Sequence, residues 1–158
     1  MIVAVRSSQG GHGEPMSDWL DAEQHVERAH EHFEAGRWDE AEQELRQAIA
    51  MNPQQGEWHF NLGLTLDAAG RHRDAALAFR AASELNPSDA QSLIMTGVSL
   101  LRSGDAAGAI ECLSRAEKLE PDNVMPYVHR IEAHAALGQH EQAEVMFYLA
   151  QQVDPRSA

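Results

Sequence analysis

Cysteine and basic residues are scarce in this sequence, and each shortage excludes something. Cys112 is the only cysteine among 158 residues, so no internal disulfide can form and nothing indicates an oxidising compartment. The 12 Lys and Arg residues are outnumbered by 25 Asp and Glu residues, which gives a net charge of −13. Nucleic acids and anionic membranes would therefore repel the chain. We expect protein partners that are neutral or basic.

Long apolar runs are also missing. The opening MIVAV is followed at once by Arg6, and this run is shorter than the core of a signal peptide and far shorter than a membrane span. The resulting expectation is a cytoplasmic location. Residues 1–15 are rich in Gly and Ser and show no periodicity, so they are predicted to form a disordered leader before a single domain over 16–158.

Motifs for catalysis, cofactors and metals are absent as well. The sequence contains no GxGxxG, Walker, GxSxG or HExxH pattern and no paired cysteines. Glu27, His30 and Glu34 do share one helical face, but several of the nine histidines recur at equivalent positions of a repeat, which favours surface or packing roles. We expect no enzymatic activity, no metal and no cofactor.

The main feature that is present is one phrase repeated every 34 residues. Each copy begins with glycine, continues as Ala-x3-large-x2-Ala and ends with proline, and this spacing of apolar residues marks one face of a helix. Aromatic residues are few and alanine is abundant, which is typical of closely packed helices. The glycines are Gly36, Gly70, Gly104 and Gly138; the large residues are Leu45, Phe79, Leu113 and Phe147; the prolines are Pro53, Pro87, Pro121 and Pro155.

Each position of the phrase has a physical reason. Glycine tolerates the positive φ that a tight turn between two helices requires. The first alanine allows the two helices to cross closely, and the large residue one turn later fills the gap between them. Proline ends the second helix, because it lacks an N–H and disfavours helix in the residue before it. One helix pair cannot bury its own apolar face, so the pairs are expected to stack.

This phrase resembles the tetratricopeptide repeat family, whose signature is W-x2-L-G-x2-Y, then A-x3-F, then P over 34 residues. The resemblance covers four units, residues 22–55, 56–89, 90–123 and 124–157. It implies an all-α fold, a right-handed superhelical solenoid of antiparallel helix pairs. Gly63 and Gly97 match the signature glycine, whereas the first unit has Ala29 and the fourth has Ile131 there. Terminal units of such repeats are commonly the least regular.

The resemblance also implies where a partner binds, because first helices of successive units line a concave face in this family. The expected lining has an apolar middle, which suits an extended segment or the apolar stripe of a helix. Asn61 is the strongest single candidate, since its amide can bond to any partner backbone. A clamp for a terminal carboxylate is disfavoured, because Glu27 holds the place in unit one that Asn61 has in unit two and basic residues are almost absent from the lining. The predicted groove residues are Phe60, Asn61, Leu64, Ile94, Met95, Val98, Leu101, Val128 and His129.

The second helix of the last unit is a further candidate surface. Val145, Met146, Tyr148 and Leu149 stand where the first unit has polar residues, which leaves this helix apolar almost all round. An exposed apolar surface of this kind marks a contact with another protein or another part of the chain. We expect an assembly contact here, either self-association or a partner subunit. The alternative is that a capping helix is missing from this sequence.

The leading hypothesis from these observations is a noncatalytic adaptor or scaffold that binds a peptide or helix in its groove. The alternatives are a structural subunit that docks or self-associates through its last helix, and a chaperone similar to those that shelter translocators in type III secretion. The sequence leaves the identity of the partner open.

Overall fold

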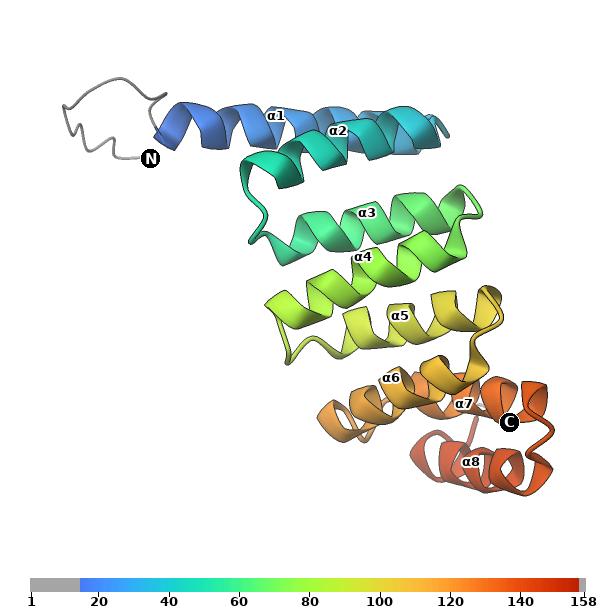
Figure 1. The fold of residues 1–158 in the computed structure, drawn as a ribbon. Coiled ribbons are helices and arrows are strands. Elements are labelled where there is room, and N and C mark those ends of the chain that lie inside the picture. The colour runs from blue at the N-terminus through green and yellow to red at the C-terminus, as the bar shows by residue number, and fades with distance from the viewer. Residues whose placement is uncertain (1–14, 157–158) are drawn as a thin grey trace.

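The structure, a computed structural model, describes residues 15–156, and in this part of the chain it contains eight helices and no strand. Figure 1 shows four antiparallel helix pairs stacked in chain order, with α1–α2 at one end and α7–α8 at the other. The helices are α1 (Pro15–Glu34), α2 (Trp38–Met51), α3 (Gly56–Ala68), α4 (His72–Leu85), α5 (Ala90–Arg102), α6 (Ala106–Leu119), α7 (Met125–Ala136) and α8 (His140–Val153). The leader expected over residues 1–15 lies, apart from Pro15, outside the described residues.

The turns within and between pairs follow the predicted chemistry. Gly36, Gly70, Gly104 and Gly138 all have positive φ values, between 71 and 90°, and no other residue type has one in the described chain. Every second helix ends two residues before the repeat proline, and the residue in between takes a more extended conformation, as its proline neighbour requires. Both predictions about the helix ends are confirmed.

Within the second and third pairs, a missing side chain on one helix makes room for a large one on the other. A Cβ atom at Gly63 would lie 2.6 Å from the ring of Phe79, and one at Gly97 would lie 2.7 Å from Cγ of Leu113. Phe79 and Leu113 are fully buried as a result. In the first pair the two side chains differ less in size, because Ala29 takes the place of the glycine and Leu45 that of the large residue.

The fourth pair departs from this arrangement, and here one prediction is wrong. Phe147 was expected to fill the gap between the two helices, but its side chain is 42% exposed. Ile131 stands at the signature-glycine position, so α7 offers no space for a large residue there. Instead, Met146 and Ala150 of α8 pack against Tyr127 of α7, with Ile131 beside them.

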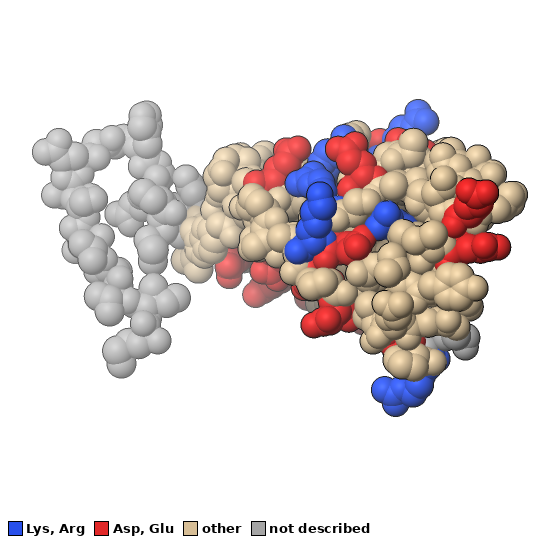
Figure 2. Space-filling model, turned by 90° about the horizontal axis from the view of Figure 1, so that it is seen from below, with Lys and Arg blue, Asp and Glu red and all other residues tan. Residues whose placement is uncertain are grey.

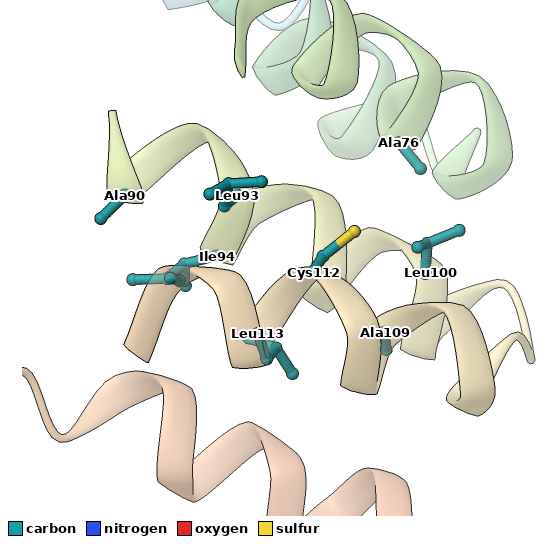
Figure 3. Packing of buried hydrophobic residues seen from close by; sticks show 9 residues of the cluster. Ala76, Ala90, Leu93, Ile94, Leu100, Ala109, Cys112 and Leu113 are labelled. Atoms are coloured by element: carbon teal, nitrogen blue, oxygen red, sulfur yellow. The ribbon is translucent and has the colours of Figure 1, made fainter. Parts of the chain in front are cut away.

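Neighbouring pairs are joined by shared apolar clusters. Ala76 of α4, Leu93 and Leu100 of α5, and Cys112 and Leu113 of α6 belong to one cluster (Figure 3). At the amino end, Trp58 of α3 packs against Ala22 and Ala48 of the first unit, and its ring lies 5.6 Å from that of Trp19. The second helices α2, α4 and α6 are thus each covered by the first helix of the next unit, which is the stacking that the repeat predicts.

Ion pairs also connect consecutive units. Arg71 donates to Glu42, Arg102 to Asp67, and Arg130 to Glu117, each across a unit boundary. Burial raises the pKa of Glu42, but hydrogen bonds from Arg46 and Arg71 outweigh this effect, so the pKa lies below its ordinary value of 4.5.

We expect Glu42→Gln to destabilise the protein in a pH-dependent way. A carboxyl whose pKa is lowered by folding stabilises the fold above its unfolded-state pKa, and that stabilisation is lost as the pH falls through the folded-state pKa. At neutral pH the substitution should lower the free energy of unfolding by about 1 kcal/mol. Urea unfolding measured across the acidic range should show the difference from wild type shrinking below pH 4.5. Glu111→Gln, a change at an exposed residue of α6, is the control and should leave the free energy of unfolding at neutral pH almost unchanged.

None of the helices described between residues 15 and 156 is both long and apolar enough to cross a bilayer.

Candidate peptide-binding groove

First helices of neighbouring units come together at the side of the stack, since α1 and α3 line one cavity and α5 contacts α7. We call the side formed by α1, α3, α5 and α7 the first-helix face. A cavity of about 400 Å³ opens on this face between α1 and α3. Its walls come from both helices, and Leu45 of α2 also contributes. The lining residues are Val26, Ala29, His30, Phe33, Glu34, Leu45, Glu57, Asn61, Leu64 and Thr65.

The cavity combines apolar walls with one directed polar group. Val26, Phe33 and Leu64 provide apolar surface, and Phe33 is held in place by an edge contact with Trp38 at 5.1 Å between ring centroids. The side-chain amide of Asn61 has no hydrogen-bond partner among residues 15–156. An amide of this kind can donate to and accept from a peptide backbone. Asn61 and Leu64 lie together in this cavity, which is large enough for one big side chain.

The rim of the cavity is acidic. Glu34 and Glu57 lie at its edge, and His30 is 3.9 Å from Glu34. Both carboxylates are exposed, and no Lys or Arg lines the cavity. A partner that places an apolar side chain here would meet negative charge next to it, which favours a neighbouring Lys or Arg.

The predicted apolar middle of the groove is more buried than expected. Phe60 lies 5.1 Å from Phe79 in an edge contact, and Met95 packs against the same cluster. Val98 and Leu101 are half-buried against the next cluster. Ile94 is a correction, because it is only 3% exposed and belongs to the core around α5 and α6. A residue this buried cannot contact a partner.

The two groove residues expected from the fourth unit lie apart from the cavity. Val128 is half-buried on α7, and His129 is 3.2 Å from Glu132 on the same helix. The structure therefore gathers only Asn61 and Leu64 of the predicted set into one cavity. Phe33, Leu45 and Glu57 line it without having been predicted as groove residues. Phe33 lies within the first-helix pattern of unit one, and this signal was available from the sequence.

A second cavity of about 420 Å³ lies at the ends of α3 and α4. Phe60 and Glu57 reach it from α3, and the turns at Gln54 and Asn86 close its edge. Glu57 lines both cavities, so the two openings are neighbours along α3.

The surface predicted on α8 is divided between solvent and core. Val145 and Tyr148 are 53% and 62% exposed. Met146 is a correction, because it is only 8% exposed and packs against Tyr127 with Leu149 beside it. Equivalent positions to Val145 and Tyr148 are exposed in the second unit too, at Leu77 and Arg80, so these two side chains lie on the outer face of the stack.

Metal-binding side chains are not gathered in the described part of the chain. Within residues 15–156 no three His, Cys, Asp or Glu side chains are placed to hold a metal ion. Cys112 is buried, and burial raises the pKa of its thiol. This thiol is therefore a poor nucleophile.

Comparison with known proteins supports the repeat assignment. A family model described as "Tetratricopeptide repeat" matches residues 26–90 and 94–156. No protein with a curated description matches the chain.

Several solved structures share the fold. The crystal structure of MamA protein aligns with a TM-score of 0.80 at 18% identity, covering 89% of this chain and 77% of that one. YrrB, "a TPR protein with an unusual peptide-binding site", aligns with a TM-score of 0.78 at 18% identity, covering 86% and 70%. The first TPR of Spaghetti (RPAP3), bound to the HSP90 peptide SRMEEVD, aligns with a TM-score of 0.68 at 19% identity, covering 76% and 95%. Because the family model spans more than half of the residues and the helix pairs repeat as its signature requires, the chain belongs to the tetratricopeptide repeat family.

Proposed function

We propose that the chain is a noncatalytic protein-interaction module that binds an extended peptide or a helix of a partner protein on its first-helix face. The cavity between α1 and α3 is the anchor site. The observation that carries the proposal is the combination in one place of an apolar opening, a free amide at Asn61 and an acidic rim at Glu34 and Glu57.

The partner in this proposal has an apolar anchor side chain with Lys or Arg close to it. Burial of the anchor supplies most of the free energy, at about 25 cal/mol per Å² before ordering costs. Asn61 bonds the partner backbone, which fixes its direction without selecting a sequence. The net charge of −13 attracts such a segment from a distance.

Two structural neighbours support this proposal by their own ligands. RPAP3 is seen with a peptide, and YrrB is described as having a peptide-binding site. The peptide SRMEEVD in the RPAP3 structure carries three acidic residues and one basic residue, so it is acidic overall, and the rim here is acidic as well. The proposed ligand of this chain is therefore of the opposite charge. An adaptor or scaffold role and a cytoplasmic location remain predictions that accompany the proposal.

The test is selection of peptides from a random phage-displayed library on the full chain. Enriched peptides should share a large apolar residue within a few positions of Lys or Arg. Leu64→Glu should weaken their binding at least about ten-fold, because it places a charge in the apolar wall. Glu57→Lys should also weaken it and should reduce its salt dependence. Fluorescence anisotropy of a labelled peptide measures both effects.

The matched control is Leu77→Glu, since Leu77 is an exposed leucine on the outer face of α4. It should leave binding unchanged, and circular dichroism should show equal helicity for all variants. Binding that survives both Leu64→Glu and Glu57→Lys, or a library enriched in acidic peptides, would contradict the proposal.

A further inference from the structure

One repeat position behaves differently in the last unit. Leu45, Phe79 and Leu113 are 2%, 0% and 0% exposed, whereas Phe147, at the same position, is 42% exposed. In the first two units a following helix contributes to this burial. Leu45 clusters with Leu62 and Leu66 of α3, and Met95 of α5 packs against the cluster that contains Phe79.

The neighbouring positions on the same helix face have the same role. In α4, Ala76 lies one turn before Phe79 and contacts the cluster of α5 (Figure 3). In α2 the position of Ala76 is held by Glu42, which pairs with Arg71 of the following unit. In α6 Glu117, one turn after Leu113, pairs with Arg130 of the following unit. Residues three and four positions apart share one helix face. This face of each second helix is therefore the surface that receives the next unit.

In α8 the same three positions are occupied by Glu144, Phe147 and Gln151, which we call the terminal face. Glu144 is exposed, Gln151 is half-buried, and no helix follows α8 in residues 15–156. The face is about 10 Å long at 1.5 Å rise per residue, which is two turns of a helix. Because α3, α5 and α7 occupy the equivalent surfaces of α2, α4 and α6, the shape that fits here is another helix.

The charge of the α7–α8 end of the stack indicates what charge the bound helix should carry. Between Ile131 and Pro155 the chain has no Lys or Arg, and Glu132 of α7 is exposed on the same end of the stack. Glu144 repeats the position of Glu42, but no cation among the described residues pairs with it. Figure 2, viewed from the α8 end, shows a surface without charged side chains at the lower right, bordered by acidic groups and, at its lower edge, by a basic group. A basic residue of a partner can occupy the place that Arg71 takes beside Glu42.

A second copy of the chain does not fit the terminal face. Each first helix packs one face against the unit before it. In α3 this face includes Trp58, which contacts Ala48 of α2. The corresponding side of α5, at Ser92, Thr96 and Ser99, is fully buried. In α1 the same positions carry Gln24, Arg28 and Glu31, all exposed.

Stacking α1 of one copy on α8 of another would bury two charges, at a cost of several kcal/mol per ion. Placing two terminal faces together would bring Glu144 of each copy against a chain whose net charge is −13. Both arrangements of two copies are unfavourable.

We propose that the terminal face binds an amphipathic helix of a partner protein, whose apolar stripe covers Phe147 and whose Lys or Arg pairs with Glu144. This site is separate from the cavity between α1 and α3. The chain then carries two independent contact surfaces.

The experiment selects helix-forming peptides from a phage-displayed library on the full 158-residue chain, with depletion on the Phe147→Glu variant. Selected peptides should carry apolar residues at i, i+3 or i+4, and i+7, with Lys or Arg beside them. Anisotropy of a labelled peptide should show at least about ten-fold weaker binding to Phe147→Glu and to Glu144→Lys. Glu144→Lys changes an exposed residue, so it tests the site without risk to the fold.

Leu64→Glu is the control for the groove and should leave this peptide binding unchanged. Failure to enrich any helical peptide, or equal binding to wild type and Glu144→Lys, would overturn the proposal. Sedimentation velocity decides the remaining alternative. A dimer of the wild-type chain that Phe147→Glu converts to monomer would mean that a second copy occupies the face, and this too would overturn it.

Discussion

Phe79→Ala is expected to lower the free energy of unfolding by about 3–5 kcal/mol, as is usual for deletion of a fully buried aromatic side chain. Phe79 is 0% exposed and its ring fills the space left by Gly63. Phe79 also connects the second unit with the third, because Met95 of α5 packs against the apolar cluster that contains Phe79. Alanine would leave a cavity between two units, so the loss includes contacts on both sides. Urea unfolding followed by far-UV circular dichroism measures the change.

Phe147→Ala is a control of the same residue type at the same repeat position. Because Phe147 is 42% exposed and lies on the terminal face, its removal should cost less than about 1 kcal/mol. Equal losses for the two substitutions would contradict the assignment of Phe79 to the centre of the stack and of Phe147 to its open end.

Gly63→Ala is the second substitution with a large expected effect. The added Cβ would lie within 2.8 Å of three ring atoms of Phe79, and an aromatic ring packed on both sides cannot move away cheaply. Overpacking of this kind costs about 1–3 kcal/mol. Gly97→Ala is the matched control, since Leu113 is smaller and more adaptable than a ring, and it should cost less. Thermal and urea unfolding of both variants test the prediction.

The first unit indicates how the clash can be relieved. It places Ala29 opposite Leu45, and both side chains are buried without a glycine. The double variant Gly63→Ala with Phe79→Leu should therefore be more stable than the sum of the two single changes predicts. A coupling free energy near zero in this double-mutant cycle would show that the two positions do not determine each other.

The candidate site could be predicted from the sequence only in part. The repeat register places Asn61 and Leu64 on the first-helix face, and both line the cavity. The same register places Ile94 there, yet Ile94 is in the core. Helical periodicity shows which residues share a face. It does not show which part of that face is buried, because a first helix packs against other helices on both sides. The rotation of α5 between α4 and α6 decides which part of an apolar face remains open.

Periodicity places Phe33 on the first-helix face, but it does not show that Phe33, Leu45 and Glu57 meet at one cavity. They reach the cavity from three different helices, and their meeting depends on how closely α1, α2 and α3 approach. Interhelix distance depends on all the side chains between the helices, which a repeat pattern does not specify. The net charge of −13 is a property of composition, but it does not by itself place Glu34 and Glu57 at this rim.

The sequence by itself determined the helix pairs, their boundaries and their stacking, because these follow from local requirements. A positive φ at Gly70, a restricted residue before Pro87 and one apolar face per helix are each set within a few residues. Only the tertiary structure decided which copies of a repeated residue are buried. Phe79 and Phe147 occupy the same place in the phrase, yet one is in the core and the other is at the surface. Burial is a property of the neighbours a side chain meets: Ile131 leaves no space for Phe147 against α7, and no helix follows α8 in the described chain.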